Sequence, residues 1–431
     1  MREAMILGVA VLLTGPAVPA EPPTEQAPGG AAQLVADGAW CWFADPRAIR
    51  HKGKRDCTYV GYVTSGGDIC VSAFDHDTRT LTAATLHRRL NRDDHANPGL
   101  LIRPDGRLWV FYSGHSRRPM YSRISKAPED ISQWEPARKV TCDIPGSNGY
   151  CYANPVQLSA EKQRVYLFWR GGNWQPAFAT TDDGKTWSAA RTFLQAPRGT
   201  PPYVKICSDG ESRIHIAYTD GHPMHMTANN VYYLCYRDGA FWKADGTKVR
   251  DVADLPIKTA EGDRVYDAAK HKARGWIWDI ALDGEKPVIV HATIPDVRNH
   301  RYRYARWDGT AWRNHELTEA GAYINGPGEQ FYSGGVVLDH DDPSVVFCSR
   351  QVNGVHELQR FKTADGGKTW TARPITTGST LKNVRPVVVR GHRGDELIVL
   401  WMQGRYDYYT RYRTSLMAWP MKKRKQEGNG P

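Results

Sequence analysis

Short apolar runs and polar turns alternate along this chain, and the apolar runs come in pairs. Each pair starts with a run of strand length, turns at Gly, Asp or Asn, and continues in a second hydrophobic run. Helical periodicity is almost absent, and no linker divides the chain near its middle, as two β-sandwiches would require. The pairs cover residues 45–62, 97–112, 154–169, 203–218, 278–291, 334–348 and 385–401. The pattern predicts an all-β fold, a seven-bladed β-propeller over residues 37–420.

A turn that ends in a tryptophan recurs in these units and supports the same architecture. Residues 180–187 and 363–370 fit the Asp-box pattern Ser/Thr-x-Asp-x-Gly-x-Thr-Trp, and residues 237–242 and 307–312 are degenerate copies. In such a turn the Asp side chain caps backbone amides and the Trp packs between neighbouring sheets. The four tryptophans are 55, 70 and 58 residues apart, which fits one four-stranded blade with its loops.

Both ends of the chain differ from the repeats in composition. An apolar run at residues 4–13, closed by small residues, predicts a signal peptide over residues 1–20. The run is too short to span a bilayer. Pro, Glu, Gly, Ala and Gln predict a flexible leader over residues 21–36, and Lys and Arg predict a basic flexible tail over residues 421–431. We therefore expect a secreted protein, extracellular or periplasmic, that is not anchored in a membrane.

Charge and cysteine content narrow the class of partner. The formal net charge is +11, and in an exported protein a basic balance favours an acidic polysaccharide over nucleic acid. The eight cysteines include no Cys-x-x-Cys pair, so they do not form a disulfide framework, although Cys142 and Cys151 could close one loop. We expect an acidic polysaccharide partner, no nucleic acid, and a monomer.

The propeller topology predicts which side chains meet on one face. The first strand of each blade begins on that face and the second strand ends on it, so the residues at these positions converge. They are rich in His, Tyr, Arg and Lys, which suit the binding and deprotonation of an acidic sugar. The catalytic candidates are His95, His115, Tyr152 and Arg170, and the substrate-binding candidates are Asn97, Asn154, Tyr203, Lys205, His222, Trp278, Arg350, Arg385 and Arg405.

Each catalytic candidate also has a purely structural explanation. His95 could be a loop histidine bonded to Asp94, and Tyr152 could pack in the core. Arg170 could be a surface cation. Only the convergence of these side chains on one face favours a functional site.

At these residues the sequence resembles the BNR-repeat propellers that include the ulvan lyases. In those lyases two histidines at a similar spacing flank the uronate, and His95 and His115 match them. A tyrosine and an arginine on the next blade complete the site, where Tyr152 and Arg170 match. The similar segments are residues 42–48, 93–98, 112–115, 209–223 and 229–246, within a likeness that extends over nearly the whole mature chain. The resemblance implies a polysaccharide lyase that cleaves a rhamnose-uronate, ulvan-like polysaccharide.

β-Elimination explains why this set of residues would be needed. The reaction removes the C5 proton beside the uronate carboxylate and expels the O4 substituent, so negative charge gathers on the carboxylate as the enolate forms. Arg170 is predicted to neutralise that charge. Tyr152 and His95 are the predicted base and acid, in either order, while His115 would hold the uronate or share the proton transfer. Tyr152 could act as a base only with a strongly lowered pKa, which Arg170 could supply.

Three other functions fit parts of the pattern. A glycoside hydrolase such as an α-L-rhamnosidase needs two paired acids, and a sialidase needs three arginines around a carboxylate. A non-catalytic carbohydrate-binding propeller would use the same turns and aromatic residues for binding alone. The candidate acids are Asp45, Asp94 and Asp220, and the candidate arginines are Arg47, Arg350 and Arg385.

His222, His225 and Cys235 are candidate ligands of a structural metal ion. The His-x-x-His spacing suits zinc in a loop, with the cysteine supplied by a strand. The alternative is that both histidines are satisfied structurally and the cysteine is a buried free thiol. A zinc or calcium ion here would be structural, because elimination requires no cofactor.

Overall fold

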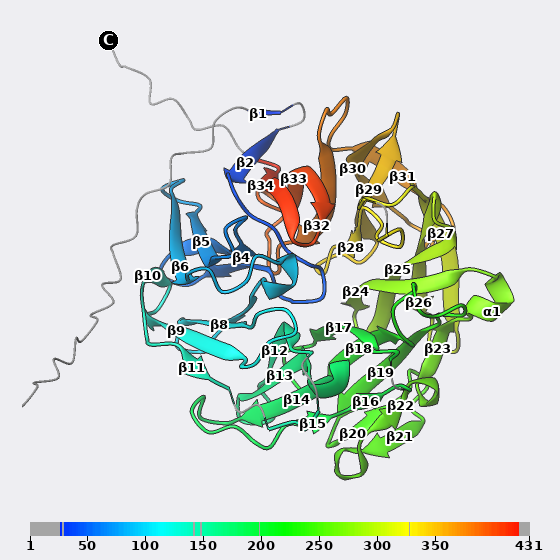
Figure 1. Cartoon of the computed structure of the whole chain (residues 1–431), viewed down its shortest axis with the longest axis horizontal. Helices are drawn as coiled ribbons and strands as arrows, with labels where there is room; N and C mark the ends of the chain where they lie inside the picture. Colours follow the sequence, from blue (N-terminus) through cyan, green and yellow to red (C-terminus); the bar gives the residue numbers. More distant parts are fainter. Residues whose placement is uncertain are drawn as a thin grey trace, which may run out of the picture.

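The computed structural model describes residues 26–27, 30–140, 143–146, 149–197, 199–326 and 328–421. Seven sheets surround a central axis as the blades of a propeller (Figure 1), which confirms the predicted all-β, seven-bladed fold. Each predicted pair of runs forms the first and second strands of one blade. The signal peptide at 1–20, the tail from residue 422 onward and Cys142 lie outside the described residues.

Blades 1 to 3 follow one another along the chain. Blade 1 contains β3 (Ala48–Lys52), β4 (Asp56–Val63), β5 (Ile69–Asp75) and β6 (Leu81–His87). Blade 2 contains β7 (Gly99–Ile102), β8 (Leu108–Tyr112), β9 (Tyr121–Ala127) and β10 (Asp130–Trp134), and β11 (Arg138–Lys139) also pairs with β9. Blade 3 contains β12 (Cys151–Leu158), β13 (Arg164–Arg170), β14 (Pro176–Thr181) and β15 (Arg191–Thr192).

Blades 4 to 6 continue the same order. Blade 4 contains β17 (Tyr203–Ser208), β18 (Ile214–Thr219), β19 (Val231–Arg237), β20 (Ala240–Trp242) and β21 (Lys248–Asp251), with β23 (Asp263–Tyr266) added to β19. Blade 5 contains β24 (Arg274–Asp283), β25 (Lys286–Asp296), β26 (Asn299–Trp307) and β27 (Trp312–Gly321). Blade 6 contains β28 (Val336–Leu338), β29 (Val345–Val352), β30 (Val355–Lys362) and β31 (Thr371–Pro374).

The remaining elements are short. The strands β16 (Leu194–Gln195) and β22 (Ile257–Lys258) form a parallel pair outside the blades. The helix α1 (Ala268–His271) and the 3-10 turns η1 (Asp94–Ala96), η2 (Gly172–Trp174), η3 (Val252–Asp254) and η4 (Thr259–Glu261) lie in loops. Within the described part of the chain, no helix is both long and apolar enough for a membrane crossing.

The seventh blade joins the two ends of the propeller. It contains β32 (Lys382–Val388), β33 (Val399–Tyr408) and β34 (Arg411–Trp419), and β2 (Ala31–Val35) forms its fourth strand, with β1 (Gln26–Ala27) beside it. The pairing of Ala32 with Ala418 closes the ring without a covalent bond. The prediction of a flexible leader is therefore wrong for residues 31–35, because their small and apolar side chains are mostly buried in this sheet.

The two complete Asp boxes lie between the third and fourth strands of blades 3 and 6. Asp365 accepts a hydrogen bond from the backbone amide of Thr369 at 2.9 Å. In the other box the cap is Asp183, which accepts two backbone amides at 2.7 Å each. The aspartate that the sequence pattern selects there, Asp182, instead pairs with Arg164.

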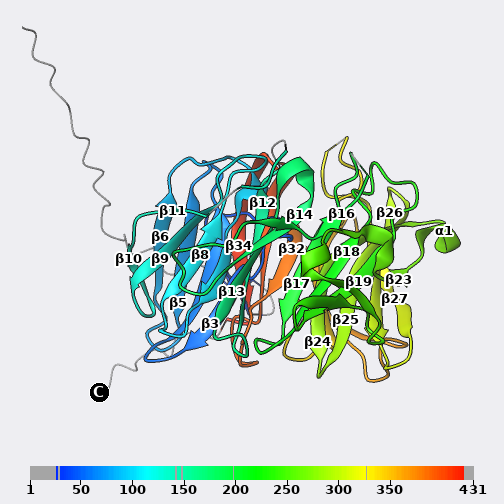
Figure 2. The same cartoon turned by 90° about the horizontal axis from the view of Figure 1, so that it is seen from below.

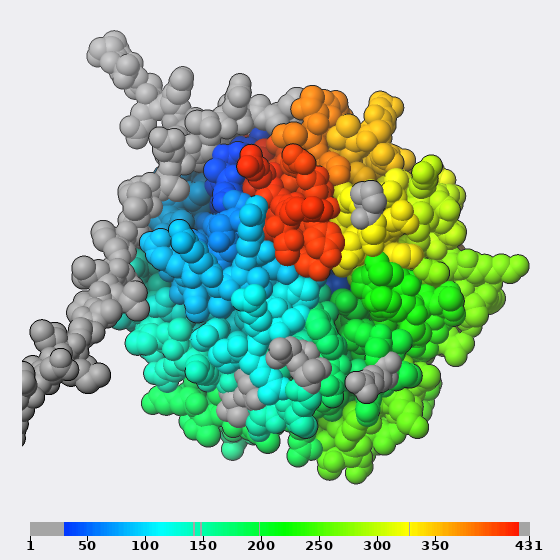
Figure 3. Space-filling view, viewed as in Figure 1, coloured from blue at the N-terminus to red at the C-terminus, as the bar shows by residue number. Residues whose placement is uncertain are grey.

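Residues 38–47, here called the central segment, cross the channel that the blades surround. The Trp42 ring stacks on Trp278 of β24, with centroids 4.1 Å apart. The indole nitrogens of Trp40 and Trp42 donate to backbone carbonyls of blades 7 and 5, at 2.9 and 3.0 Å. In the space-filling view this blue segment is visible at the bottom of the hollow on the axis (Figure 3). The channel is therefore filled by the chain's own residues.

Seen from the side, the strands run between two faces of the molecule (Figure 2). We call the face where each first strand begins the upper face, which Figures 1 and 3 show, and the opposite one the lower face. The turns between first and second strands lie on the lower face. The candidate residues from strand starts and second-strand ends therefore belong to the upper face.

Candidate functional site

Asp93 connects the two predicted catalytic histidines. Its Oδ1 lies 2.8 Å from Nδ1 of His95, and its Oδ2 lies 2.7 Å from Nδ1 of His115. The two imidazole rings stack with centroids 4.2 Å apart and an angle of 6° between their planes. Because both Nδ1 atoms face one carboxylate, both Nε2 atoms point away from it in the same direction. Neither Nε2 has a hydrogen-bond partner among the residues that the structure describes.

Blade 3 brings Tyr152 and Arg170 to the histidine pair. The Tyr152 ring centroid is 5.5 Å from that of His95, and the guanidinium carbon of Arg170 is 4.5 Å from the Tyr152 ring. Tyr152 lies at a β-bulge and has a φ of +64°, a strained conformation for a residue with a side chain. A bulge next to a site redirects a side chain. The four catalytic candidates are thus brought together as the sequence predicted.

Three contacts position the guanidinium of Arg170, and one of its nitrogens has no hydrogen-bond partner among the described residues. Its Nε donates to the carbonyl of Gly149 at 3.0 Å, and its Nη1 donates to the Tyr203 hydroxyl at 3.3 Å. The ring of Trp174 lies against the same guanidinium, 4.5 Å from its carbon atom. Its Nη2 is buried and has no hydrogen-bond partner in the described part of the chain. An anionic group that entered here would satisfy that nitrogen.

The two histidines have opposite pKa shifts. Burial lowers the pKa of His95, but Cys41 and the carboxylates of Asp93 and Asp94 outweigh burial and raise it to about 10. Burial and the positive charge of His95 lower the pKa of His115 to about 4, against the opposing effect of Asp93. Near neutral pH the pair therefore holds one imidazolium, His95, and one neutral imidazole, His115.

The pKa of Tyr152 differs from what a catalytic base requires. Burial raises the pKa of Tyr152 well above 10, and although Arg170 lowers it, the effect of burial is larger. The hydroxyl therefore keeps its proton at neutral pH. This corrects the expectation that Arg170 would make Tyr152 a base, and it leaves Tyr152 suited to donate a proton.

Five predicted substrate-binding side chains bind the central segment instead. Asn97 accepts the Cys41 amide at 3.0 Å, and Trp278 is the residue stacked on Trp42. All five are at most 2% exposed. The set is Asn97, Asn154, Lys205, Trp278 and Arg385. We correct their prediction as substrate contacts, because the axis on which they converge is occupied by residues 38–47.

The charged members of this set are neutralised inside the protein. Lys205 pairs with Asp45 and donates to the carbonyl of Trp42 at 2.5 Å. Arg385 pairs with Asp94 and donates to the carbonyl of Trp40 at 2.9 Å. Buried charges need such partners.

Asn154 holds the same segment through its amide. Its Oδ1 accepts the Asp45 amide at 3.2 Å, and its Nδ2 donates to the carbonyl of Phe43 at 2.8 Å. These contacts fix the floor of the upper-face hollow.

The other four predicted binding residues divide into two pairs. Tyr203 contacts Arg170, and its ring centroid is 5.6 Å from that of His222, so both lie next to the catalytic candidates. Arg350 donates to a backbone carbonyl of β27, and Arg405 has a side chain that is 77% exposed and pairs with Asp407. The structure does not bring these two arginines into the histidine site.

The predicted metal ligands are not gathered. His222 and His225 have ring centroids 5.7 Å apart, but Cys235 pairs with His215 in the sheet. It lies four residues along β19 from Val231 at the upper end, which is on the order of 13 Å. The assignment of Cys235 with the two histidines is therefore wrong. A structural zinc or calcium ion stays a prediction without a ligand set.

Three groups of ionisable side chains in the described residues have donor atoms within 4.8 Å of one another. Two of them contain His95, whose Nδ1 is already engaged by carboxylates. In the third group, on the lower face, His392 is bonded to Asp339 at 2.9 Å. Hydrogen bonds among the members account for the clustering, and we assign no metal ligand.

Sequence reasoning missed several residues of the site. Tyr409 lies over both histidines, with its ring centroid 4.8 Å from that of His95, and its carbonyl accepts the Asp94 amide at 2.9 Å. Glu329 accepts a hydrogen bond from Tyr408 at 3.4 Å, and burial raises the pKa of its carboxyl. Tyr408 and Tyr409 lie at the end of a second strand, where candidates were sought. They were missed because β33 ends at Tyr408, three residues beyond Arg405, where the sequence predicted its end.

Curated relatives of this chain are ulvan lyases. The enzyme of Pseudoalteromonas sp. (strain PLSV) is 24% identical over 313 residues, which is 60% of this chain and 61% of that enzyme. This chain therefore spans less than two thirds of that relative. The enzyme of Nonlabens ulvanivorans is 22% identical over 380 residues, 75% of each chain.

Solved structures share the fold. An ulvan lyase of polysaccharide lyase family PL25, bound to -[GlcA(1-4)Rha3S]-, has a TM-score of 0.69 and 16% identity, covering 90% of this chain and 96% of its own. The polysaccharide lyase Uly1 has a TM-score of 0.58 and 11% identity, covering 90% of this chain and 97% of its own. The profile of BNR repeat-containing family members matches residues 57–320. By this match over more than half of its length, the chain belongs to the BNR repeat-containing family.

Proposed function

We propose that this protein is a polysaccharide lyase that cleaves a rhamnose-uronate, ulvan-type polysaccharide by β-elimination. The relatives support the reaction class. The observation that carries the proposal is Asp93 bound to both stacked histidines, one charged and one neutral, beside the unpartnered nitrogen of Arg170. Such a pair supplies a base and a stabilising cation from adjacent rings.

Charge on the uronate is balanced by two cations. Arg170 and the imidazolium of His95 face the carboxylate, whose negative charge grows as the C5 proton leaves. Both are almost fully buried, so their attraction to the enolate is stronger than it would be in water. Asp93 and Asp94 keep His95 charged, and the carbonyl of Gly149 positions Arg170.

The neutral imidazole of His115 and the protonated hydroxyl of Tyr152 determine the direction of proton transfer. His115 is neutral, donates its Nδ1 proton to Asp93, and takes the C5 proton of the uronate on Nε2. The electrons of the C5–H bond form the C4–C5 double bond, and the C4–O4 bond breaks. Tyr152 gives its hydroxyl proton to O4, and solvent then returns the proton from His115 to Tyr152. Each transfer contributes about 10²–10⁴-fold.

The hydrolase and the sialidase each lose two of their three candidate residues. Asp45 and Asp94 are neutralised by buried cations, so neither can pair with a second acid as a hydrolase needs. Arg47 and Arg385 are engaged by those same two aspartates rather than free to surround a carboxylate as in a sialidase.

We also propose that the protein acts outside the cell. The proposal rests on the apolar run at residues 4–13 and on the basic net charge. Mass spectrometry of protein from the culture medium or periplasm should find a mature amino terminus near residue 21. No metal takes part in the proposed steps.

The deciding experiment incubates the purified protein with ulvan and with other uronate polymers. A rise in the ultraviolet absorbance of unsaturated uronates shows elimination. New reducing ends without that absorbance would indicate a hydrolase, and retention on a polysaccharide gel with neither product would indicate a binding protein. The His115→Ala variant is the control for catalysis by this site.

A further inference from the structure

A second cavity lies on the lower face, far from the histidine pair along the strands of blade 4. It has a volume of about 250 Å³, lies between blades 4 and 5, and is open to solvent on one side. Blade 4 contributes the start of β18, the end of β19 and the turn after β20, and blade 5 contributes its first and third turns. None of these residues belongs to the site on the upper face, so the function of that site does not account for the cavity.

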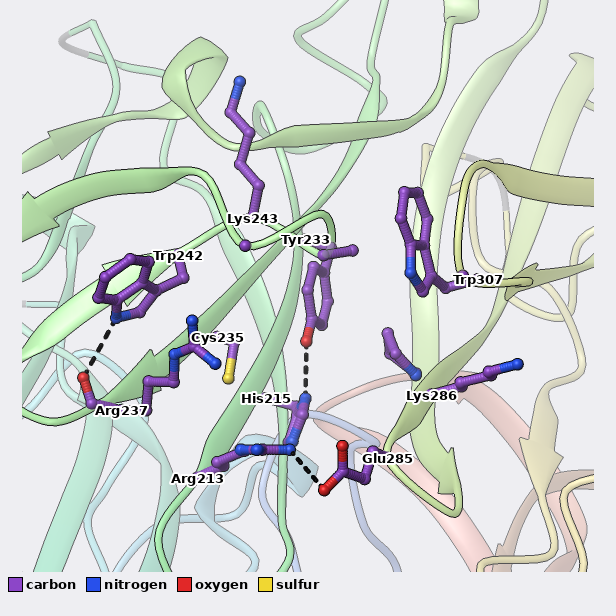
Figure 4. Close-up of a pocket in the computed structure, with 14 residues that line it drawn as sticks. Arg213, His215, Tyr233, Cys235, Arg237, Trp242, Lys243, Glu285, Lys286 and Trp307 are labelled. Atoms are coloured by element: carbon purple, nitrogen blue, oxygen red, sulfur yellow. Dashed lines mark hydrogen bonds and ion pairs between the residues drawn. The ribbon is translucent and has the colours of Figure 1, made fainter.

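Aromatic residues form the walls of this cavity. Trp242 of blade 4 and Trp307 of blade 5 stand on opposite sides, with Tyr233 and His215 between them (Figure 4). The Tyr233 hydroxyl and the Nδ1 of His215 are bonded at 2.7 Å. Aromatic faces pack against the C–H faces of a sugar, and a few polar groups fix its orientation. At this volume the cavity is smaller than the roughly 300–1,000 Å³ of pockets for drug-sized ligands, so it fits one sugar unit.

The charges of the cavity lining favour an anion, although the amine of Lys286 already donates to the carbonyl of Asp308 at 3.1 Å. Its lining has four cations and one carboxylate: Arg213, Arg237, Lys243 and Lys286 against Glu285. Arg213 pairs with Glu285 at 3.3 Å, but that carboxylate is 81% exposed, so the pair is weak.

Arg237 is held in place without a carboxylate. Its guanidinium carbon lies 4.5 Å from the Trp242 ring, and it forms no ion pair with any described residue. A planar guanidinium fixed in this way presents a fork that fits a carboxylate or a sulfate.

The equivalent cavity between blades 2 and 3 provides an internal comparison. It has a volume of about 200 Å³ and also contains an arginine on a tryptophan, with Arg103 at 5.4 Å from the Trp109 ring. Its lining has three carboxylates, however, those of Asp105, Asp182 and Asp183. Of these two cavities, the one between blades 4 and 5 has the charge balance that favours an anion, and the one between blades 2 and 3 has the opposite balance.

We propose that the cavity between blades 4 and 5 binds one anionic sugar unit, sulfated or uronic, as a second and non-catalytic carbohydrate site. This inference rests on the proposed function for the identity of the polymer. A site on the face opposite the catalytic residues would hold one stretch of polysaccharide while another stretch enters the upper-face hollow, and it would increase the local concentration of substrate.

The test is calorimetric titration of a sulfated rhamnose-glucuronate tetrasaccharide into the His115→Ala protein, which cannot turn it over. We expect binding at the upper face and in the cavity. Adding Arg237→Gln should weaken the cavity site by about tenfold or more, so that only the upper-face site remains measurable. Adding Arg103→Gln, the matched arginine of the acidic cavity, should leave both sites. Equal melting temperatures would exclude misfolding.

Each alternative gives a distinct result. Equal binding by the Arg237→Gln and Arg103→Gln proteins overturns the proposal. If inorganic sulfate at the same concentration displaces the sugar from the cavity, the site is a simple anion site and the sugar assignment is wrong. If binding depends on Arg237 but the wild-type protein never forms unsaturated product, the cavity site stands and the lyase proposal falls. With Arg237→Gln alone, turnover of the tetrasaccharide should stay at the wild-type rate.

Discussion

Two groups of side chains occupy comparable positions in the blades yet differ in what they contact. Asn97, Asn154, Lys205, Trp278 and Arg385 are buried against the central segment, and Lys205 and Arg385 are paired there with aspartates. The catalytic candidates lie beside that segment. Among the described residues, the two histidine Nε2 atoms and Nη2 of Arg170 have no hydrogen-bond partner, and the same holds for single polar atoms of Asn97 and Trp278 and for two of Arg385. The first group stabilises the centre of the propeller, and the second group is available to a ligand.

Asp94 joins the two groups. It is fully buried, pairs with Arg385, accepts the Tyr406 hydroxyl at 2.5 Å, and has Oδ1 2.8 Å from Nδ1 of His95. One carboxylate therefore neutralises a structural arginine and supports the charge of a catalytic histidine. The difference between the groups can be tested by replacing one member at a time.

His115→Ala should have the largest effect, a loss of turnover of about 10²–10⁴-fold, because it removes the proposed base. The free energy of unfolding should fall by less than the loss of a buried ion pair would cost. The side chain stacks on His95, but it is 17% exposed and forms one hydrogen bond among the described residues, to Asp93. Initial rates of elimination measure the first effect, and urea denaturation measures the second. Polymer binding at equal protein concentration shows whether the site stays formed. His315→Ala, in β27 of blade 5, is the control. Near-normal elimination by His115→Ala would place the chemistry elsewhere.

Arg385→Met should instead destabilise the fold. It removes the arginine from the buried carboxylate of Asp94 and leaves only His95 beside it, which should cost up to about 3–5 kcal/mol of the free energy of unfolding. Urea denaturation monitored by tryptophan fluorescence measures the loss. The double variant Arg385→Met with Asp94→Asn should recover part of it, because the unpaired charge is gone. If Arg385→Met were as stable as wild type and lost only polymer affinity, Arg385 would be a substrate contact after all.

The sequence predicts the blades well because their signals are local. Paired apolar runs, turn residues and Asp boxes each lie within one blade, so seven units and the face that carries His95, His115, Tyr152 and Arg170 follow from spacing alone. Topology also identifies which strand ends converge on the axis. Those steps need no knowledge of contacts between distant segments.

The central segment could not be predicted in this way. Its course depends on the pairing of β2 with β34 at the other end of the chain, and no local pattern encodes a contact at that separation. The expectation that strand-end residues face the substrate was therefore wrong for Lys205 and Arg385, because residues 38–47 occupy the space that these side chains face. The pKa difference between His95 and His115 likewise arises from burial and from Asp93 and Asp94 in three dimensions.

Arg170→Lys tests the catalytic group at constant charge. Lysine keeps the cation but loses the planar fork, including the Nη2 that has no partner in the described residues. We expect turnover to fall roughly 10²-fold, with a much smaller change in polymer affinity, since neutralisation matters most as the enolate forms. Measuring kcat and the dissociation constant for both proteins separates the effect on turnover from the effect on affinity. Equal losses in both would mean that Arg170 contributes only to binding.

The pH dependence of elimination follows from the opposite pKa shifts of the two histidines. His115 must be neutral, so the rate should rise with pH through about 4, and His95 must be charged, so the rate should fall as pH passes about 10. Between these values the rate should be nearly constant. Asp93→Asn removes a negative charge from His95, lowers its pKa, and should move the alkaline limb to lower pH. Rate profiles of both proteins test this, and an unchanged alkaline limb would contradict the role of His95.

The charge of His95 also links pH to stability. Its pKa is raised above the ordinary value of 6.5. The stability that the charge of His95 contributes is therefore fully present below pH 6.5 and is lost as pH rises through about 10. Loss of activity at high pH without unfolding, seen by circular dichroism, separates the catalytic effect from this one.

The smallest effect is expected for Arg405, which we compare with Lys205 because both were predicted to bind substrate. Arg405 is exposed and pairs only with Asp407, so Arg405→Gln should raise KM by about two- to fivefold at most and leave the melting temperature unchanged. Lys205→Met should lower the melting temperature, because Asp45 loses a buried partner, while KM of the folded protein stays close to wild type. Thermal melts and KM at two salt concentrations distinguish them, since an exposed cation that meets the polymer loses its effect at high salt. If Lys205→Met raised KM in a salt-dependent way without loss of stability, Lys205 would reach the substrate, and the division between the two groups would fail.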